Sequence, residues 1–387
     1  MNQKNRAKAS QNSQNQQIIH NFAVYIYKTR MSKKHNFYAG PAILPETVLK
    51  QSAEVVIDFA GMGLSLLEIS HRSKQFEAVM DESRALVLEL LNLSNEYEVL
   101  FLSGGASTQF FMIPMNLLSE QGTAYYVNTG TWASNAIKEA KNFGNTVVLA
   151  SSEDDQFRHI PKGFNIPTDG NYLHITSNNT IYGSQYQQFP NCQIPLVCDM
   201  SSDIFSKKLD FSQFGLIYAG AQKNMGPAGV TLVVIRKDLI GSSGRKMPTM
   251  LNYKTHAEKG SMYNTPPVFP IYVSMLTLKW IKEMGGLESM EKRNREKAEL
   301  LYSEIDRNNC FEGTVRKEDR SWMNVVFIPK KVEWESLFLE SCKLNGCVGL
   351  AGHRSVGGFR ASLYNALELS SVKVLVETMQ EFEKKYA

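Results

Sequence analysis

The most reactive group that the sequence offers is the lysine in "AGAQKNMGPAGV", residues 219–230. Lys223 follows the apolar run "LIYAGA" and precedes a turn rich in Gly and Pro, so its amine stands at the end of a predicted strand. A lysine in that place either reaches solvent along its aliphatic stem or acts as a nucleophile. The motifs that follow the neighbouring strands decide between the two interpretations.

Three such motifs surround a common edge of the predicted sheet. "SGGAST", Ser103–Thr108, joins a strand to a helix, and free N–H groups at a helix start can bind an anion. The turn matches neither common nucleotide-binding pattern. Trp132 either packs in the core or stacks on a planar ligand. Asp199, at the end of a buried strand, either caps a helix or holds a protonated ring nitrogen.

Together these groups predict a site for pyridoxal 5'-phosphate. Ligands of open α/β sheets bind beyond the carboxyl ends of the strands, where the anion-binding turn, Trp132, Asp199 and Lys223 all fall. In such a site the lysine amine forms a Schiff base with the aldehyde and then moves the Cα proton of the substrate. Burial and a cationic neighbour would lower its pKa enough for this role.

Two His-Arg pairs indicate an anionic substrate. His71 and Arg72 lie in "EISHRSKQF", and His353 and Arg354 lie in "GLAGHRSVGGFR". Each pair alone fits a solvated surface. One pair in each predicted domain suits a dianionic or carboxylate-bearing substrate.

The elements that must position these groups predict an α/β fold. From residue 46 to about 290, short apolar strands alternate with amphipathic helices, which favours a mostly parallel sheet flanked by helices. The alternation of strands and helices ends near residue 288, where a smaller α+β domain is predicted to begin. We therefore expect an N-terminal segment at 31–45, a large domain at 46–287 and a small domain at 288–387. The polar segment 1–30 is expected to be disordered or mis-annotated, with a start at Met31.

Composition narrows the class of protein further. The chain has 387 residues, of which 43% are hydrophobic, and its 42 basic and 38 acidic residues are interspersed, so no nucleic-acid partner is expected. The five cysteines form no metal-binding pattern, and no metal is expected. No apolar run reaches the roughly 18–20 residues of a membrane span. The absence of a secretory signal favours the cytoplasm.

Several long strings resemble one family of enzymes. "NFYAGPAILP", "EISHRSKQF", "IYAGAQKNMGPAGVTLVVIRKDLIG", "GSMYNTPPVFPIYV" and "GHRSVGGFRASLYNA" closely resemble the phosphoserine aminotransferase family, which belongs to the class V, fold-type-I enzymes that depend on pyridoxal phosphate. The likeness runs in order from about residue 35 to the C-terminus. The resemblance implies the fold-type-I architecture, with a large cofactor-binding domain and a smaller C-terminal one.

The resemblance also implies a role for each matching residue. Lys223 resembles the Schiff-base lysine, Asp199 the partner of the pyridine nitrogen, and Trp132 the stacking side chain. Thr180 resembles the hydroxyl that bonds the ring oxygen. The residues implied to bind the cofactor phosphate are Ala106 and Ser107 through their N–H groups, Gln222 beside them, and Asn264 and Thr265 from the other subunit of a homodimer.

For the substrate, the resemblance implies that Arg354 binds the α-carboxylate. His71, Arg72 and His353 are similar to residues that hold the substrate phosphate, or the side-chain carboxylate of glutamate in the other half-reaction. The chain departs from some relatives at Ser107, where they carry an arginine. That departure leaves the backbone role intact and removes one positive charge available to the substrate.

The implied reaction transfers an amino group between glutamate and 3-phosphohydroxypyruvate, giving O-phospho-L-serine and 2-oxoglutarate on the path to serine. A four-carbon phosphohydroxy substrate of pyridoxine synthesis stays open. The alternatives are another class V activity, such as an alanine–glyoxylate aminotransferase or a cysteine desulfurase using Cys342 or Cys347, and a binding protein that has lost the chemistry.

Overall fold

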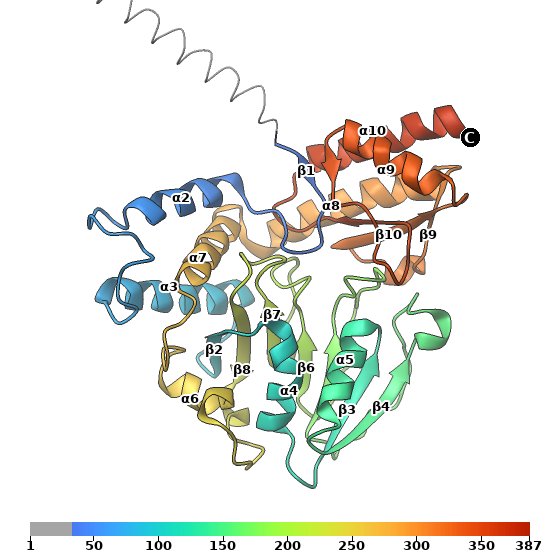
Figure 1. Cartoon of the computed structure of the whole chain (residues 1–387). Helices are drawn as coiled ribbons and strands as arrows, with labels where there is room; N and C mark the ends of the chain where they lie inside the picture. The colour runs from blue at the N-terminus through green and yellow to red at the C-terminus, as the bar shows by residue number, and fades with distance from the viewer. Residues whose placement is uncertain (1–32) are drawn as a thin grey trace, which may run out of the picture. The chain divides into compact units, whose positions relative to one another are not determined.

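Seven strands form the central sheet of the computed structural model, which describes residues 33–387 (Figure 1). The strand order is β2-β8-β7-β6-β5-β3-β4. The five strands β3 to β7 are parallel to one another, and β8 runs antiparallel to both β7 and β2. The mostly parallel sheet expected from the sequence is thus confirmed. The strands are β2 (Tyr97–Leu102), β3 (Thr123–Asn128), β4 (Asn145–Ser151), β5 (Tyr172–Thr176), β6 (Leu196–Asp199), β7 (Phe214–Gly220) and β8 (Thr231–Arg236).

The inner strands are buried on both faces. Every residue of β5, β6 and β7 is buried, as expected for parallel strands that read as continuous apolar runs. Alternate side chains enter two different cores: Val99 and Phe101 of β2 point into one, and Leu100 points into the other. The edge strand β4 instead exposes Val147 and Val148. The middle of the sheet is therefore a rigid base for the residues at its strand ends.

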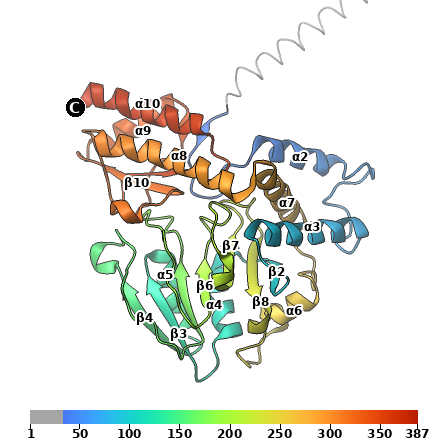
Figure 2. The ribbon, with the colours of Figure 1, turned by 180° about the vertical axis from the view of Figure 1, so that it is seen from behind.

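Helices cover both faces of the sheet. Side chains of α4, α5 and α6 join one core, and those of α2, α3 and α7 join the other (Figures 1 and 2). Helix α3 begins after Ser73, whose hydroxyl accepts from the Phe76 N–H, and ends at Asn92 in the left-handed conformation. The helices are α2 (Glu46–Ile57), α3 (Lys74–Leu91), α4 (Gly105–Leu117), α5 (Thr131–Ala140), α6 (Tyr253–Glu258) and α7 (Val268–Glu283).

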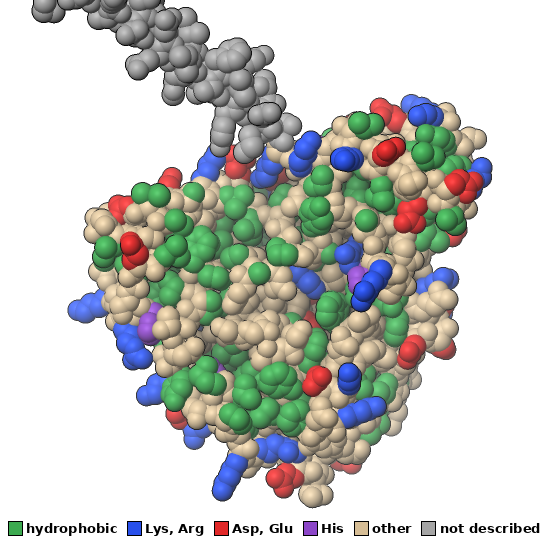
Figure 3. Space-filling view, viewed as in Figure 1, with side chains coloured by type: hydrophobic (Ala, Val, Ile, Leu, Met, Phe, Trp, Pro, Cys, Tyr) green, Lys and Arg blue, Asp and Glu red, His purple; other side chains and the backbone are tan. Residues whose placement is uncertain are grey.

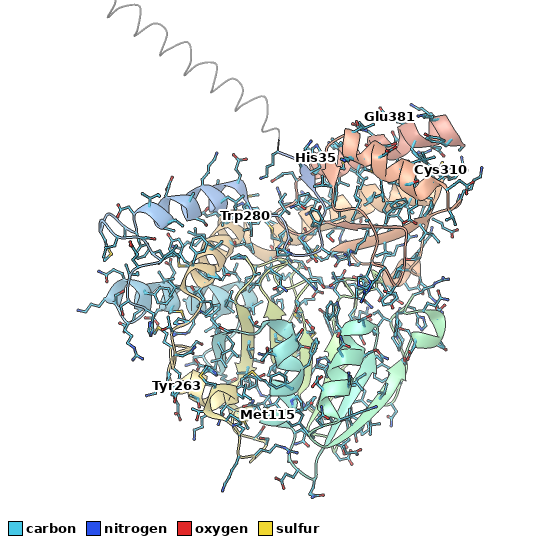
Figure 4. The ribbon with its side chains drawn as sticks, in the orientation of Figure 1. His35, Met115, Tyr263, Trp280, Cys310 and Glu381 are labelled. Carbon is cyan, nitrogen blue, oxygen red and sulfur yellow. The ribbon has the colours of Figure 1, made fainter. Side chains whose placement is uncertain are left out.

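A third core lies in the C-terminal part of the chain. Strand β10 pairs antiparallel with β9 and β12, and the rings of Phe311 and Phe382 both pack against Phe338 in the core beside them. Figure 4 labels Cys310 and Glu381 in this part of the fold. The elements are α8 (Gly286–Arg307), β9 (Phe311–Gly313), β10 (Asn324–Pro329), α9 (Trp334–Leu344), β11 (Cys347–Val348), β12 (Phe359–Ser362) and α10 (Leu369–Tyr386), with a short β1 (His35–Asn36) near the start of the chain.

The expected division of the chain stays a prediction. Segment 1–30 lies outside the described residues, and residues 36–387 form one compact unit. Helix α8 begins at Gly286, close to the expected boundary, and contributes Met290 to a sheet core and Leu301 to the C-terminal core. Phe37 also belongs to the C-terminal core. Within residues 33–387, no helix is both long and apolar enough to cross a membrane.

Candidate active site

The predicted site residues follow strands that end at the same edge of the sheet. Strand β6 ends at Asp199 itself, and β7 ends three residues before Lys223. Trp132 lies in the first turn of α5, just after β3, and Thr180 follows β5. Because β3, β5, β6 and β7 are parallel, their carboxyl ends meet at one edge, where open α/β folds bind their ligands.

The Lys223 amine is held by two of the predicted partners. Its Nζ donates to Thr180 Oγ1 at 2.7 Å, and it lies 5.7 Å from the centroid of the Trp132 ring. Thr180 is itself buried, in a turn fixed by Asn179, whose side chain accepts from the backbone of Ile181. The structure thus brings together the Lys223 amine, the Thr180 hydroxyl and the Trp132 ring. The first and last of these residues in the sequence, Trp132 and Lys223, are 91 positions apart.

The surroundings of Lys223 make its amine less basic than usual. Burial is the main cause and lowers its pKa from 10.5 to about 8, although the nearby Asp199 charge acts in the opposite direction. The positive charge of Arg360 lowers the pKa further. An amine with a pKa near 8 has a substantial neutral fraction at pH 7, as a nucleophile or base requires.

Asp199 is buried and oriented by its own turn. Its Oδ1 accepts from the Ser201 N–H at 2.9 Å and from the Ser201 hydroxyl at 2.6 Å. Ser201 Oγ in turn accepts from the Gly220 N–H, so the ends of β6 and β7 are joined behind the carboxylate. The two interpretations of Asp199 are compatible, because the same carboxylate orders its local turn and lies within electrostatic reach of Lys223.

The glycine-rich turn precedes α4 as expected. Gly104 and Gly105 both have positive φ, at 99° and 72°. A Cβ on Gly104 would lie 2.1 Å from Thr108 Oγ1, whereas one on Gly105 would enter open space. The first turn of a helix leaves its N–H groups without intrahelical partners, and those of Ala106 and Ser107 belong to this turn. The turn therefore has the form of an anion site.

The N-terminal segment contacts Lys223 and its neighbour Gln222. The Gln222 carbonyl accepts from the Ala42 N–H at 2.8 Å. Gly40 lies against the lysine stem, where a Cβ would be in van der Waals contact at 3.4 Å from Lys223 Cγ. Its φ of 149° gives the string "NFYAGPAILP" a physical reason to carry glycine at residue 40.

Arg360 is a site residue that the sequence analysis did not single out. It lies on β12 between buried Phe359 and Ala361, and its Nη1 donates to the Thr180 carbonyl at 3.2 Å. Burial lowers the pKa of its guanidinium. The guanidinium therefore lies close to Thr180 and Lys223, and it comes from the C-terminal part of the chain. The signal in the sequence was a charged residue inside an apolar strand.

The two His-Arg pairs differ in their relation to this site. Burial, then the charges of Arg360 and Arg354, lower the pKa of His353, which places this histidine near both arginines. Its Nδ1 is 2.7 Å from Ser355 Oγ. Arg354 is exposed. Within residues 33–387, no hydrogen bond, ion pair or ring contact joins His71 or Arg72 to the group around Lys223.

Asn264, which precedes Thr265, lies beside the glycine-rich turn of its own chain. Both are exposed, and Asn264 lines a cavity of about 250 Å³ together with Ser103 and Gly104. The placement is compatible with a role at the cofactor phosphate. The expectation that they reach the site of another subunit stays a prediction.

The described residues fit pyridoxal phosphate. Trp132 Nε1 and Arg360 Nε are buried without a hydrogen-bond partner among these residues. Buried polar groups are normally paired, so two unpaired donors near Lys223 are consistent with a site for a polar ligand. An amine, a carboxylate, an indole and an anion site at one sheet edge match the aldehyde, ring nitrogen, ring face and phosphate of this cofactor.

Comparison with known proteins identifies the family. The model of the class-V aminotransferases matches residues 34–375, which is most of the chain. The chain belongs to the class-V aminotransferase family, as the sequence resemblance implied, and is an aminotransferase.

The most similar relatives carry one name. The phosphoserine aminotransferase of Flavobacterium psychrophilum is 60% identical over 354 residues, covering 91% of this chain and 99% of that protein. A solved phosphoserine aminotransferase from Bacillus circulans subsp. alkalophilus is 48% identical, with a TM-score of 0.90 and coverage of 92% and 100%. A phosphoserine aminotransferase with bound pyridoxal phosphate, from Trichomonas vaginalis, is 35% identical, with a TM-score of 0.85 and coverage of 90% and 100%.

Proposed function

We propose that this aminotransferase acts on phosphoserine, exchanging an amino group between glutamate and 3-phosphohydroxypyruvate to give O-phospho-L-serine and 2-oxoglutarate. The observation that carries the proposal is the position of Lys223 Nζ, 2.7 Å from Thr180 Oγ1, where the Thr180 carbonyl is also bound by Arg360. Thr180 thus contacts the reacting amine of Lys223 through its hydroxyl and the Arg360 guanidinium, a cation for the substrate, through its carbonyl.

The cofactor in this proposal is pyridoxal 5'-phosphate. When bound, it supplies an aldehyde that exchanges with amino groups and an electron-poor ring that withdraws charge from the substrate's α-carbon. Lys223 Nζ would hold the aldehyde carbon and later accept and return the Cα proton. Its pKa of about 8 suits both tasks, because the free amine and the ammonium are both populated near neutral pH.

The other side chains hold the cofactor at its separate groups. Trp132 would cover one face of the ring, and Thr180 would bond the ring oxygen. Asp199 would accept a hydrogen bond from the protonated ring nitrogen. The phosphate would lie at the first turn of α4, on the N–H groups of Ala106 and Ser107, with Gln222, Asn264 and Thr265 as further phosphate ligands.

We assign the substrate's α-carboxylate to Arg360. Its guanidinium is part-buried, reaches the Thr180 backbone and influences the pKa of Lys223, whereas Arg354 is exposed. Arg354 then joins His353, and His71 with Arg72, as candidates for the distal anion of the substrate. One such cluster must accept a phosphate in one half-reaction and the glutamate side-chain carboxylate in the other.

The proposed enzyme is a homodimer whose active site lies at the subunit interface. Segment 46–67 exposes large apolar side chains, among them Ile57 at 80%, and Figure 3 shows hydrophobic side chains gathered over the region of α2. The exposed set on this segment is Leu49, Val56, Ile57, Met62, Leu64 and Leu67. His71 and Arg72 follow it directly, so a second copy packed here would bring its own pair towards the neighbouring site.

Compartment and substrate range complete the proposal. We place the enzyme in the cytoplasm, because all five cysteines are free thiols. Amination of a four-carbon phosphohydroxy acid for pyridoxine synthesis is a second activity that the same anion cluster could support.

The rival activities receive less support from the geometry. A cysteine desulfurase needs a mobile, reactive thiolate, but Cys342 and Cys347 are 1% and 3% exposed. Burial raises the pKa of both thiols, that of Cys347 to about 11. Such thiols stay protonated and unreactive at neutral pH.

A coupled assay tests the choice of substrate. Purified protein with pyridoxal phosphate is supplied with O-phospho-L-serine and 2-oxoglutarate, and glutamate formation is followed. The parallel reaction contains alanine and glyoxylate. We expect glutamate in the first reaction and little glycine in the second. Glycine formation without any turnover of phosphoserine would overturn the proposal in favour of an alanine–glyoxylate activity.

A further inference from the structure

A buried polar pair lies beneath Asp199, and the proposed mechanism does not use it. His174 on β5 and Tyr218 on β7 are 1% and 0% exposed, and His174 Nε2 is 2.9 Å from the Tyr218 hydroxyl. Neither residue can reach substrate from beneath the sheet edge. Burying a histidine and a phenol is unfavourable unless their polar atoms are paired, so the arrangement calls for a reason.

Strand register places Tyr218 beside Asp199, and His174 opposite Val197 on the same strand as Asp199. Tyr218 is the Cα partner of Asp199 across β6 and β7, so the two side chains lie next to each other on the same face of the sheet. On that face, the Tyr126 ring is stacked on His174 with centroids 4.9 Å apart. The histidine ring is therefore held in place between its neighbours.

Burial and the charge of Asp199 determine which of the atoms of His174, Tyr218 and Asp199 carry protons. Burial raises the pKa of Tyr218, and the negative charge of Asp199 on the neighbouring strand adds to the effect. Burial lowers the pKa of His174 to about 3, so the imidazole is neutral at every pH near neutrality. An ionised carboxylate can only accept, so in a hydrogen bond between these neighbouring side chains the Tyr218 hydroxyl is the donor.

The direction of the second hydrogen bond then follows. With its O–H directed at Asp199, the Tyr218 oxygen accepts a hydrogen bond from His174 Nε2–H. This tautomer leaves Nδ1 as an unprotonated acceptor, and His174 Nδ1 is the ring atom without a hydrogen-bond partner among the described residues. An unpaired buried acceptor costs less than an unpaired N–H donor.

We propose that Tyr218 is a positioning residue whose hydroxyl donates to Asp199 and accepts from His174, so that the chain His174–Tyr218–Asp199 fixes the carboxylate toward the ring nitrogen of the cofactor. The inference rests on the proposed function, in which Asp199 holds that nitrogen. It assigns to two buried residues a part in cofactor binding, in the way that hydrogen-bond partners behind a metal site orient the ligands of the metal.

The test compares two ligands that differ only at the ring nitrogen. Apoprotein of the full chain is titrated with pyridoxal phosphate and with 1-deazapyridoxal phosphate, which carries C–H in place of the nitrogen, and Kd is measured by quenching of tryptophan fluorescence. We expect Tyr218→Phe to weaken binding of pyridoxal phosphate about tenfold and to leave the deaza analogue unchanged. Tyr172→Phe is the control, because it removes another buried phenol, which pairs with Tyr126.

His174 supplies a second pair of variants. His174→Gln keeps an N–H donor for Tyr218 and should retain the preference for pyridoxal phosphate, whereas His174→Leu should lose part of it. Equal loss of affinity for both ligands in Tyr218→Phe would show a merely structural role and overturn the inference alone. A wild-type protein that binds both ligands equally would overturn the role of Asp199, and the inference with it.

Discussion

Replacing Lys223 by methionine should stabilise the apoprotein at neutral pH. The native state holds the lysine where burial lowers its pKa from 10.5 to about 8, so the ammonium form is disfavoured by folding. Each pKa unit corresponds to about 1.36 kcal/mol, which gives a penalty of about 3 kcal/mol at pH 7. Loss of the hydrogen bond to Thr180 offsets about 1 kcal/mol. The variant should therefore gain about 2 kcal/mol.

The sign of the pH dependence follows from proton linkage. Between pH 8 and 10.5 the unfolded chain binds more protons at this lysine than the native state does, so wild-type stability rises with pH across that window. The advantage of Lys223→Met should shrink over the same window, by about 2 kcal/mol between pH 7 and pH 9.5. The packing of the methionine side chain does not depend on pH. The pH-dependent part of the stability difference therefore reports only the charge of Lys223.

Urea unfolding at one protein concentration, at both pH values, measures this difference. Lys50→Met is the control, because Lys50 is exposed and its hydrogen bond to Glu46 raises its pKa instead. Its change in stability should be nearly independent of pH between pH 7 and pH 9.5, because a pKa raised above 10.5 alters proton binding only at higher pH. A Lys223→Met variant that is no more stable than wild type at pH 7, or whose gain is independent of pH, would refute the reasoning.

Three further predictions concern the substrate, the lysine support and the subunit interface. Arg360→Gln should lower kcat/KM about 10- to 150-fold for glutamate and phosphoserine alike, and steady-state kinetics that show a loss for only one substrate would contradict the α-carboxylate role. Gly40→Ala should weaken cofactor affinity more than Gly61→Ala does in a fluorescence titration, because both positions have positive φ but only Gly40 abuts Lys223. Equal losses would argue against that contact. Ile57→Lys should shift the sedimentation coefficient from dimer towards monomer, whereas the equally exposed control Val332→Lys should not; two unchanged dimers would remove α2 from the interface.

The residues that sequence reasoning found share one property: their chemical type is unusual for their place. Lys223 and Asp199 are charged residues at the ends of apolar runs, and parallel strand ends must converge. The glycine-rich turn and Trp132 follow the same rule. Local patterns were therefore sufficient to place these residues at one end of the sheet and to predict most of the sheet itself.

The residues that it missed depend on register or on contacts between distant segments. Arg360 faces Lys223 only because β12 pairs with β10 at a particular offset, whereas Arg354 drew attention because it adjoins a histidine. His174 and Tyr218 meet through the alignment of β5, β6 and β7, which no local pattern encodes. The antiparallel direction of β8 had a clearer signal, because the connection 221–230 is too short for a helical crossover.

The central claim is that the Lys223 amine is the group that reacts with pyridoxal phosphate. Purified protein is incubated with the cofactor, reduced with borohydride and digested, and the peptide that carries the added mass is identified. We expect one modified peptide, labelled at Lys223, and no stoichiometric label in Lys223→Ala. Stoichiometric labelling of a different lysine, or a protein that takes up no cofactor, would contradict it.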